Sequence, residues 1–178
     1  SEGPSYYSLK DRLVEVGETG STGLALGGKV VLSFGHNDDS KFITYKDQEH
    51  PVVKEENISV NNSPQDLALL TVQTPYQFKE IRRKIYADVY SGDGFLLFLK
   101  KGTLIAHQVK RITPCDNIMT QQGHQTQFAY RYQVNSASGW CGGVLVGIVG
   151  GNPMILGMHV AGNGSHGIAA RIFPNFSQ

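Results

Sequence analysis

The chain has no long hydrophobic run and very little cysteine. No window approaches the ~20 consecutive apolar residues that span a bilayer, and the opening stretch SEGPSYYSLK lacks the apolar segment of a signal peptide. The two cysteines, Cys115 and Cys141, stand in a chain too large to need a disulfide for stability. We therefore expect no membrane anchor in this chain and two reduced thiols.

An excess of charge of one sign and the usual zinc-binding spacings are also missing. The 16 Lys and Arg residues nearly balance the 15 Asp and Glu residues, which gives a net charge of +1. The chain as a whole is therefore not a basic nucleic-acid coat, and RNA binding would have to depend on a local segment. No CxxC or HxxxH pair occurs, so a zinc site built from Cys and His is disfavoured and no cofactor is expected.

What the chain does have is glycine and short alternating apolar runs. The 21 glycines and a hydrophobic share of 40% over 178 residues predict an all-β protein with a sizeable core. About a dozen strands fit two packed antiparallel barrels of roughly six strands each. The expected strands are 22–26, 29–34, 41–46, one near 51–55 or 57–60, 66–72, 84–90, 94–99, 103–112, 127–134, 143–149, 154–160 and 167–172.

Two segments interrupt the strand pattern. Apolar residues spaced three to four apart from Ser5 to Val16, with Pro4 at the entrance, predict a short N-terminal helix. The stretch TPYQFKEIRRK (74–84) carries a proline and a cluster of charge, which indicates a connector between the two halves. We expect a first domain over 1–78 and a second over 79–178.

The stretch SASGWCGGVLV (136–146) holds the most informative cysteine. A free cysteine is often a small buried hydrophobic residue, but such a residue usually lies inside an apolar run. Cys141 precedes the run and is flanked by glycines, which allow a sharp turn. This arrangement suits an exposed nucleophile, which needs a base because a free thiol has a pKa of ~8.5.

The candidate base and its partner lie at the junctions of strands and turns. His36 follows the apolar run KVVLSF, and Asp66 opens the run DLALLTV. The alternatives are a plain turn histidine and an aspartate that caps a turn after Pro64. His159 lies in the apolar run MILGMHV, where it is either a core residue or a hydrogen-bond donor to a pocket. The other histidines considered, His50, His107 and His124, are interpreted as surface residues.

Together these motifs resemble the picornavirus 3C proteases, and the phrases PQDLALLTV, PYQFKEI and GMHVAGNG are most similar to the parechovirus branch. The resemblance implies a chymotrypsin-like fold of two β-barrels and a cysteine endopeptidase. Its catalytic residues would be His36 as base, Asp66 as orienting group and Cys141 as nucleophile. The oxyanion hole would be made by the backbone N–H groups of Gly139, Trp140 and Cys141.

The resemblance also implies cleavage of viral polyprotein and peptide substrates after glutamine. Ser136, His159 and Gly162 would form the pocket for that glutamine. The chain ends in PNFSQ, so a protease that released itself would leave Gln178 as its last residue and Ser1 after the upstream cut. Host proteins are a further class of candidate substrate, and the expected location is the host cytoplasm, with precursors at replication membranes.

The connector resembles the segment through which this family binds RNA. Basic side chains interleaved with an aromatic ring suit phosphate contact and base stacking, whereas the alternative is a solvated linker. The candidate RNA-binding residues, within 76–84, are Phe78, Lys79, Ile81, Arg82, Arg83 and Lys84. Two interpretations of function therefore stay open, a cysteine endopeptidase that also binds RNA and an RNA-binding module on an inactive protease fold.

Overall fold

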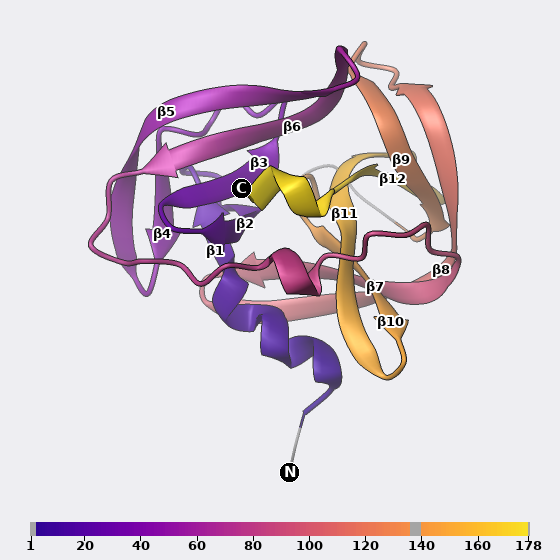
Figure 1. The fold of residues 1–178 in the computed structure, drawn as a ribbon, viewed down its shortest axis with the longest axis horizontal. Coiled ribbons are helices and arrows are strands. Elements are labelled where there is room, and N and C mark those ends of the chain that lie inside the picture. The colour runs from indigo at the N-terminus through magenta and orange to yellow at the C-terminus, as the bar shows by residue number, and fades with distance from the viewer. Residues whose placement is uncertain (1–2, 136–139, 178) are drawn as a thin grey trace.

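A computed structural model describes residues 3–135 and 140–177 and shows twelve β-strands in two six-stranded antiparallel barrels (Figure 1). The first barrel is built from β1 (Leu13–Val16), β2 (Ser21–Gly27), β3 (Val30–Phe34), β4 (Phe42–Tyr45), β5 (Gln48–Val60) and β6 (Ser63–Val72). The second is built from β7 (Gly92–Lys100), β8 (Thr103–Met119), β9 (Gln125–Gln133), β10 (Val144–Val149), β11 (Asn152–Gly162) and β12 (His166–Arg171). The predicted all-β, two-barrel fold is confirmed.

Both barrels follow the same strand order. Counted within each barrel, the neighbours run first, second, third, sixth, fifth, fourth, and the fourth strand pairs back with the first. Closure leaves no open sheet edge in either barrel. Two copies of one topology thus stand side by side, the first half of the chain in one and the second half in the other (Figure 1).

Tight turns with positive backbone φ join the hairpins. Asn61 and Asn62 connect β5 to β6, and Gly150 and Gly151 connect β10 to β11, all four with φ between 52° and 83°. Two-residue turns of this kind match the right-handed twist of the strands they join, and Asn and Gly adopt them at little cost. The sequence therefore fixes the register of these hairpins locally.

The barrels pack on each other through one apolar core. Leu24 and Leu32 from the first barrel belong to the same buried cluster as Leu97, Val144 and Met158 from the second. A buried hydrogen bond from the Leu99 backbone N–H to the Thr22 hydroxyl, 3.0 Å long, joins β7 to β2. The shared apolar core and this buried hydrogen bond thus fix the position of one barrel relative to the other.

The N-terminal helix is shorter than predicted. A 3₁₀ helix, η1 (Ser5–Arg12), follows Pro4 and buries Leu9, but the expected extension to Val16 is wrong. Residues 13–16 instead form β1, which pairs with β2 on one side and with β4 on the other. The apolar residues whose spacing indicated a helix lie in a strand instead, because pairing of this strand on both sides closes the barrel.

The connector runs outside both barrels, and the strand predicted directly after it is wrong. Residues 84–90 alternate in polarity, yet only Ile85 forms a β-bridge, with Ile155. The segment begins in the short helix η2 (Arg82–Lys84), which packs beside the C-terminal helix η3 (Pro174–Ser177). The second barrel is already closed by its own six strands, so no edge remains for this segment to extend. Among the described residues, no helix is long and apolar enough to cross a membrane.

Candidate active site

His36 and Asp66 meet at the open end of the first barrel. Strand β3 ends at Phe34, and the N–H of Gly35 donates to the carbonyl of Asp66 over 2.7 Å. A Cβ on Gly35 would lie 2.8 Å from the Asp66 carbonyl carbon, so only glycine permits this close approach. Asp66 itself has a φ of 53°, in the left-handed region that Asp tolerates better than most residues. The backbone is thus shaped to bring the next side chain, His36, onto Asp66.

The carboxylate of Asp66 binds the Nδ1 edge of His36. The two carboxylate oxygens lie 2.8 and 3.1 Å from Nδ1, and only 4% of the Asp66 side chain is exposed against 16% of His36. The hydrogen bond to Asp66, followed by a weaker contribution from Cys141, raises the pKa of His36 from 6.5 to about 9, although burial opposes the shift. The ring is therefore held protonated near neutral pH.

Cys141 faces the other edge of the same ring. Its Sγ lies 3.9 Å from His36 Nε2 and 3.4 Å from the carbonyl of Val160. Gly142 has a φ of 98°, and a Cβ there would lie 2.1 Å from the carbonyl oxygen of Thr22 in the first barrel. The glycine after the cysteine thus lets the turn approach the first barrel, which brings the thiol to His36.

Two of the three residues predicted to form the oxyanion hole are described by the structure. Gly139 lies outside the described residues, whereas Trp140 and Cys141 lie within them. The ring of Trp140 stacks on His107 at 4.4 Å and contacts Phe98, which anchors this side of the turn to β7 and β8.

His159 is buried at the base of the adjoining pocket. Only 1% of the residue is exposed, and its Nδ1 lies 2.6 Å from the hydroxyl of Tyr132. Burial lowers the pKa of His159 to about 4 and raises the pKa of Tyr132 well above its usual value, so both groups are neutral near pH 7. Gly167 makes room for the pair, because a Cβ there would lie 2.4 Å from the Tyr132 ring. Ser136, predicted for the same pocket, lies outside the described residues.

A cavity of about 580 Å³ joins these side chains. His36, Cys141, His159 and Gly162 all line it, so the predicted base, nucleophile and pocket residues open onto one continuous space. A volume of this size accommodates several peptide residues or a drug-sized ligand. Its remaining walls come from Ser21 and Phe34 of the first barrel, from the β8–β9 hairpin, and from β11, β12 and the turn between them, including Met119, Gln121, Gln122, Arg131, Asn163, His166 and Ile168.

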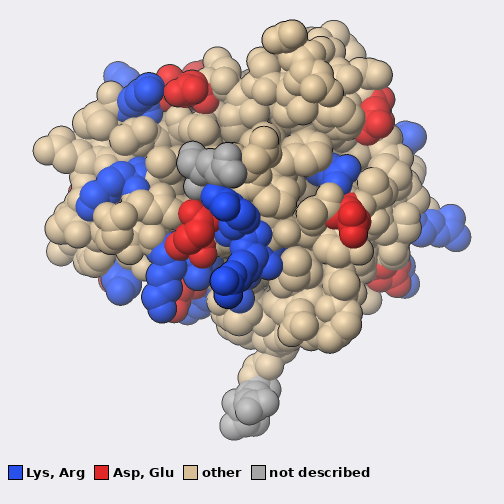
Figure 2. Space-filling view, in the orientation of Figure 1, with Lys and Arg blue, Asp and Glu red and all other residues tan. Residues whose placement is uncertain are grey.

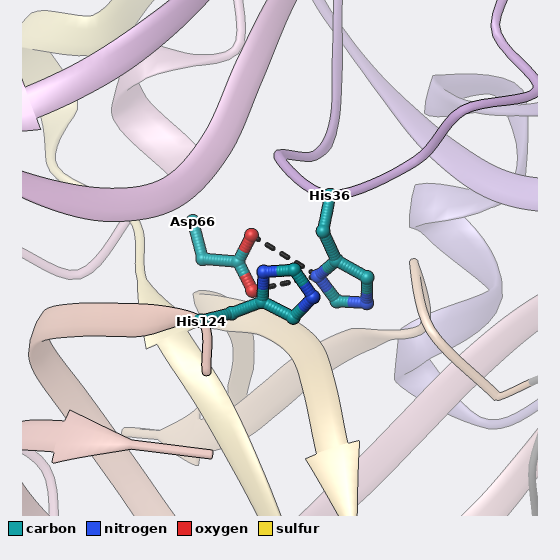
Figure 3. Close-up of side chains that lie close together, drawn as sticks. All are labelled: His36, Asp66 and His124. Atoms are coloured by element: carbon teal, nitrogen blue, oxygen red, sulfur yellow. Dashed lines mark hydrogen bonds and ion pairs between the residues drawn. The ribbon is translucent and has the colours of Figure 1, made fainter. Parts of the chain in front are cut away.

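Three histidines lie in places that the sequence did not predict. His124, in the β8–β9 turn, stacks on His36 with ring centroids 4.2 Å apart (Figure 3). His50 is 5% exposed within β5, so its interpretation as a surface residue is wrong, whereas His107, against Trp140, and His124 are partly exposed. Tyr132 was also missed, because its position in the alternating strand QFAYRYQV is typical of an ordinary core tyrosine.

The cluster of His36, Asp66 and His124 has atoms of metal-binding type within 4.8 Å of one another. Metal ions bind imidazole nitrogens in the plane of the ring. The rings of His36 and His124 are stacked with an interplanar angle of 12°, so their in-plane lone pairs do not converge on one point. Nδ1 of His36 is, moreover, already bound to Asp66. The geometry favours a hydrogen-bonded pair covered by a third ring over a metal centre.

The basic connector presents its charges and hides its apolar side chains. Lys79, Arg82 and Arg83 are exposed, whereas Phe78 and Ile81 are 7% and 0% exposed. Lys and Arg side chains gather in the middle of the face that carries η1 and η2 (Figure 2). The predicted stacking of RNA bases on Phe78 is therefore incompatible with this structure, while contact of the basic side chains with phosphates is not. Lys84 is half-buried.

Comparison with known proteins agrees with this geometry. Residues 5–164 match the sequence profile of the 3C cysteine protease (picornain 3C) family. The chain is 30% identical over 140 residues to the genome polyprotein of Human parechovirus 5 (strain CT86-6760) and 31% identical over 157 residues to that of Ljunganvirus 1. These matches cover 78% and 83% of the chain but only 6% and 7% of the polyproteins.

Solved structures show the same fold at lower identity. The HRV-C 3C protein solved with rupintrivir superimposes with a TM-score of 0.80 at 22% identity, covering 97% of this chain and 98% of that one. The MamO protease domain of Magnetospirillum magneticum superimposes with a TM-score of 0.66 at 19% identity, covering 93% and 94%. The murine norovirus NS6 protease gives a TM-score of 0.56 at 20% identity, covering 92% and 95%.

Proposed function

Because this chain belongs to the 3C cysteine protease (picornain 3C) family, we propose that it cleaves a viral polyprotein after glutamine with Cys141 as the nucleophile. The observation that carries the proposal is the alignment of three groups. The Asp66 carboxylate binds one edge of the His36 ring, and the Cys141 sulfur faces the other edge at 3.9 Å. A nucleophile, a base and an orienting group in this order form a catalytic triad.

The triad supports acyl transfer in two steps. His36 Nε2 holds the proton of the thiol, and the thiolate attacks the scissile carbonyl to form a tetrahedral oxyanion. Backbone N–H groups of Gly139, Trp140 and Cys141 stabilise that oxyanion, each by on the order of 3 kcal/mol. The proton on His36 passes to the leaving amine, and a water activated by the same histidine then hydrolyses the thioester. Asp66 keeps the ring in the tautomer that both steps require.

The pocket around His159 supports selectivity for glutamine. Tyr132 stays protonated, so its hydroxyl donates to Nδ1 of His159 and the imidazole carries its own proton on Nε2. A neutral N–H donor suits the side-chain oxygen of glutamine and gives no charge to attract glutamate. A substrate that left this buried donor unpaired would be rejected strongly, by ~10⁴ in favourable cases.

A fluorogenic peptide with the sequence Pro-Asn-Phe-Ser-Gln before the cut and Ser-Glu-Gly-Pro after it tests the proposal. We expect cleavage after Gln by the wild-type protein and none by Cys141→Ala. Cys115→Ala is the matched control, because Cys115 is a free thiol outside the cavity whose pKa is raised by burial. Cleavage by Cys141→Ala, or its loss in Cys115→Ala alone, would overturn the assignment of the nucleophile.

Selectivity is tested with peptides that carry Gln, Glu, Asn or Ala before the cut. Tyr132→Phe removes the hydroxyl that fixes the His159 tautomer and keeps the buried ring. We expect this variant and His159→Ala to lose most of the preference for Gln over Ala in kcat/KM. An unchanged preference in both variants would contradict the pocket assignment while leaving the nucleophile untouched.

A second function, binding of viral RNA, is favoured by the exposed basic side chains of the connector. Lys79, Arg82 and Arg83 are exposed, and the guanidinium of Arg12 in η1 donates to the Lys79 carbonyl, which adds a fourth cation beside Lys79. Clustered cations bind phosphates by releasing counterions, so the affinity falls steeply with salt. The connector's Phe78 and Ile81 are buried, so we expect this surface to contact phosphates and not to stack on bases.

Fluorescence anisotropy with a labelled single-stranded RNA at several salt concentrations tests this second function. Arg82→Glu and Arg83→Glu should weaken binding and reduce its salt dependence, whereas Lys41→Glu, at an exposed lysine outside the connector, should do so less. Equal affinities for the three variants would contradict a connector site. If RNA binds but no glutamine peptide is cleaved, the alternative of an inactive protease fold that binds RNA takes over.

The location we propose is the host cytoplasm. Both cysteines are free in the structure, and a thiol nucleophile needs a reducing compartment to stay active. Cleavage of host proteins stays a prediction from the family resemblance.

A further inference from the structure

His124 packs its ring flat against His36. The two ring centroids lie 4.2 Å apart and the planes differ by 12°. His124 belongs to the turn between β8 and β9 of the second barrel, whereas His36 and Asp66 belong to the first. Figure 3 shows the His124 ring lying across the contact between His36 and Asp66. One side chain of the second barrel therefore covers the hydrogen-bonded pair of the first.

The turn that carries His124 is closed by its own hydrogen bonds. The N–H of Thr120 donates to the His124 carbonyl over 2.9 Å, and the His124 N–H donates to the Thr120 hydroxyl over 3.1 Å. Gly123 has a φ of 86° and donates to the Thr120 carbonyl. The turn's own hydrogen bonds thus hold the backbone of His124 in place independently of the contact between its side chain and His36.

Asp66 alone leaves the His36 ring free to tilt. Hydrogen bonds to Nδ1 fix one edge of the imidazole, but the ring can still rotate about the Nδ1 to carboxylate direction. Phe34 touches the ring only at an edge, with centroids 4.8 Å apart and planes at 62°. The 3.9 Å separation between Nε2 and Cys141 Sγ leaves this contact too long to orient the ring firmly. A flat contact over one face supplies the missing restraint.

We propose that His124 is a positioning residue that holds His36 in line with Cys141 by stacking on its face and shielding the His36–Asp66 hydrogen bond from water. The proposal rests on the function proposed above, in which His36 transfers the proton of Cys141. It also assigns a role to the β8–β9 turn of the second barrel. Through His124, this turn helps to align His36 of the first barrel with Cys141 of the second. The contribution of His124 is the ring itself and needs no ring nitrogen.

Steady-state kinetics and proton NMR on His124→Ala and His124→Phe test the proposal. We expect His124→Ala to lower kcat by about tenfold or more, because a small misplacement of a catalytic group is costly, with a smaller change in KM. His124→Phe keeps a flat ring and should recover most of kcat. The downfield Nδ1–H resonance of His36 should broaden by exchange with water in His124→Ala and persist in His124→Phe. Asp116→Ala, at an exposed residue of the same hairpin, is the control and should match wild type.

Two results would overturn the proposal. One is a His124→Ala enzyme with wild-type kcat and an unchanged Nδ1–H resonance, and the other is a folded His124→Phe enzyme as slow as His124→Ala. The melting temperature of each variant identifies simple unfolding, and His124→Phe keeps the test valid if the alanine variant does not fold. Failure of the proposed function is distinguishable, because either the wild-type protein would then cleave no glutamine peptide, or His36→Ala and Cys141→Ala would retain cleavage, whatever the His124 variants did.

Discussion

At the scale of single residues, the structure places two histidines in opposite environments. His36 is hydrogen-bonded to the carboxylate of Asp66, whose side chain is almost fully buried, and this contact raises the pKa of His36 to about 9. His159 has a hydroxyl as its partner, and burial lowers its pKa to about 4. The same side chain is thereby suited to carry a proton in one place and to stay neutral in the other, and neighbours and burial make the difference.

The raised pKa of His36 gives a prediction about pH. Because the folded-state value of about 9 exceeds the ordinary value of 6.5, the stabilisation is complete below pH 6.5 and is lost as pH rises through about 9. Asp66→Asn removes the main cause, and Asn tolerates the φ of 53° at this position. The margin in melting temperature between wild type and Asp66→Asn should therefore be largest near pH 6 and shrink toward about pH 10.

NMR titration of the His36 Cε1 proton checks the cause directly. The midpoint should lie at about 9 in wild type and move toward 6.5 in Asp66→Asn. A melting-temperature margin that stays constant across this pH range, or an unmoved midpoint, would show that Asp66 does not hold the proton on His36.

His36, Asp66 and Cys141 could be singled out from the sequence because each stands where an apolar run meets a turn. The structure places Asp66 at one edge of the His36 ring and Cys141 at the other, and their catalytic roles stay a prediction. His124 gave no such signal, because the turn QQGHQ is polar and its contact with His36 crosses from one barrel to the other. Phe78 misled for the same reason, since an aromatic residue among charges looked exposed but is buried in the first barrel's core. The environments of His124 and Phe78 are both set by contacts with residues far away in the sequence, which a local pattern does not reveal.

At the scale of elements, most strands follow from alternation and turn residues, and the two errors have one cause. Residues 13–16 were assigned to the helix and residues 84–90 to a strand, yet the first segment pairs on both sides and the second does not. The local sequence pattern shows which secondary structures a segment is able to form. Whether the segment forms a strand also depends on whether the barrel has an unpaired strand edge beside it, and this depends on the pairing of the whole sheet.

The junction of β3 and β6 shows how closely two elements approach at the active site. A Cβ at position 35 would lie 2.8 Å from the Asp66 carbonyl carbon and 2.9 Å from the Leu67 nitrogen, and both are backbone atoms that cannot rotate away. We expect Gly35→Ala to destabilise the fold by about 1–3 kcal/mol and to lower kcat/KM by separating His36 from Asp66. Urea unfolding and the peptide assay measure the two effects.

The control for this variant is Asp38→Ala, on the same loop but with an exposed side chain. It should change the free energy of unfolding by well under ~1 kcal/mol. If Gly35→Ala were equally mild in both stability and kcat/KM, β3 and β6 could separate without cost and the close approach would not be what positions His36.

At the scale of the whole molecule, the proposed catalysis requires that the two barrels keep a fixed position relative to each other, because each supplies part of the candidate site. Gln65, directly before Asp66, joins them. Its side-chain amide donates to the carbonyls of Phe128 and Arg171 over 2.7 and 3.0 Å, and its oxygen accepts from the Phe128 N–H over 3.0 Å. The residue is fully buried, so β6 of the first barrel is bound to β9 and β12 of the second without competition from water.

Replacement of Gln65 should therefore affect stability and activity together. Gln65→Ala leaves three backbone groups of the second barrel without their partner, which we expect to cost about 2–4 kcal/mol in the free energy of unfolding. Because Asp66 is the next residue, the same change should lower kcat more than it raises KM. Gln73→Ala, at an exposed glutamine just after β6, should leave both quantities near wild type. A Gln65→Ala protein with the stability of Gln73→Ala would mean that the shared apolar core alone sets the barrels' relation, and the amide contacts only follow from it.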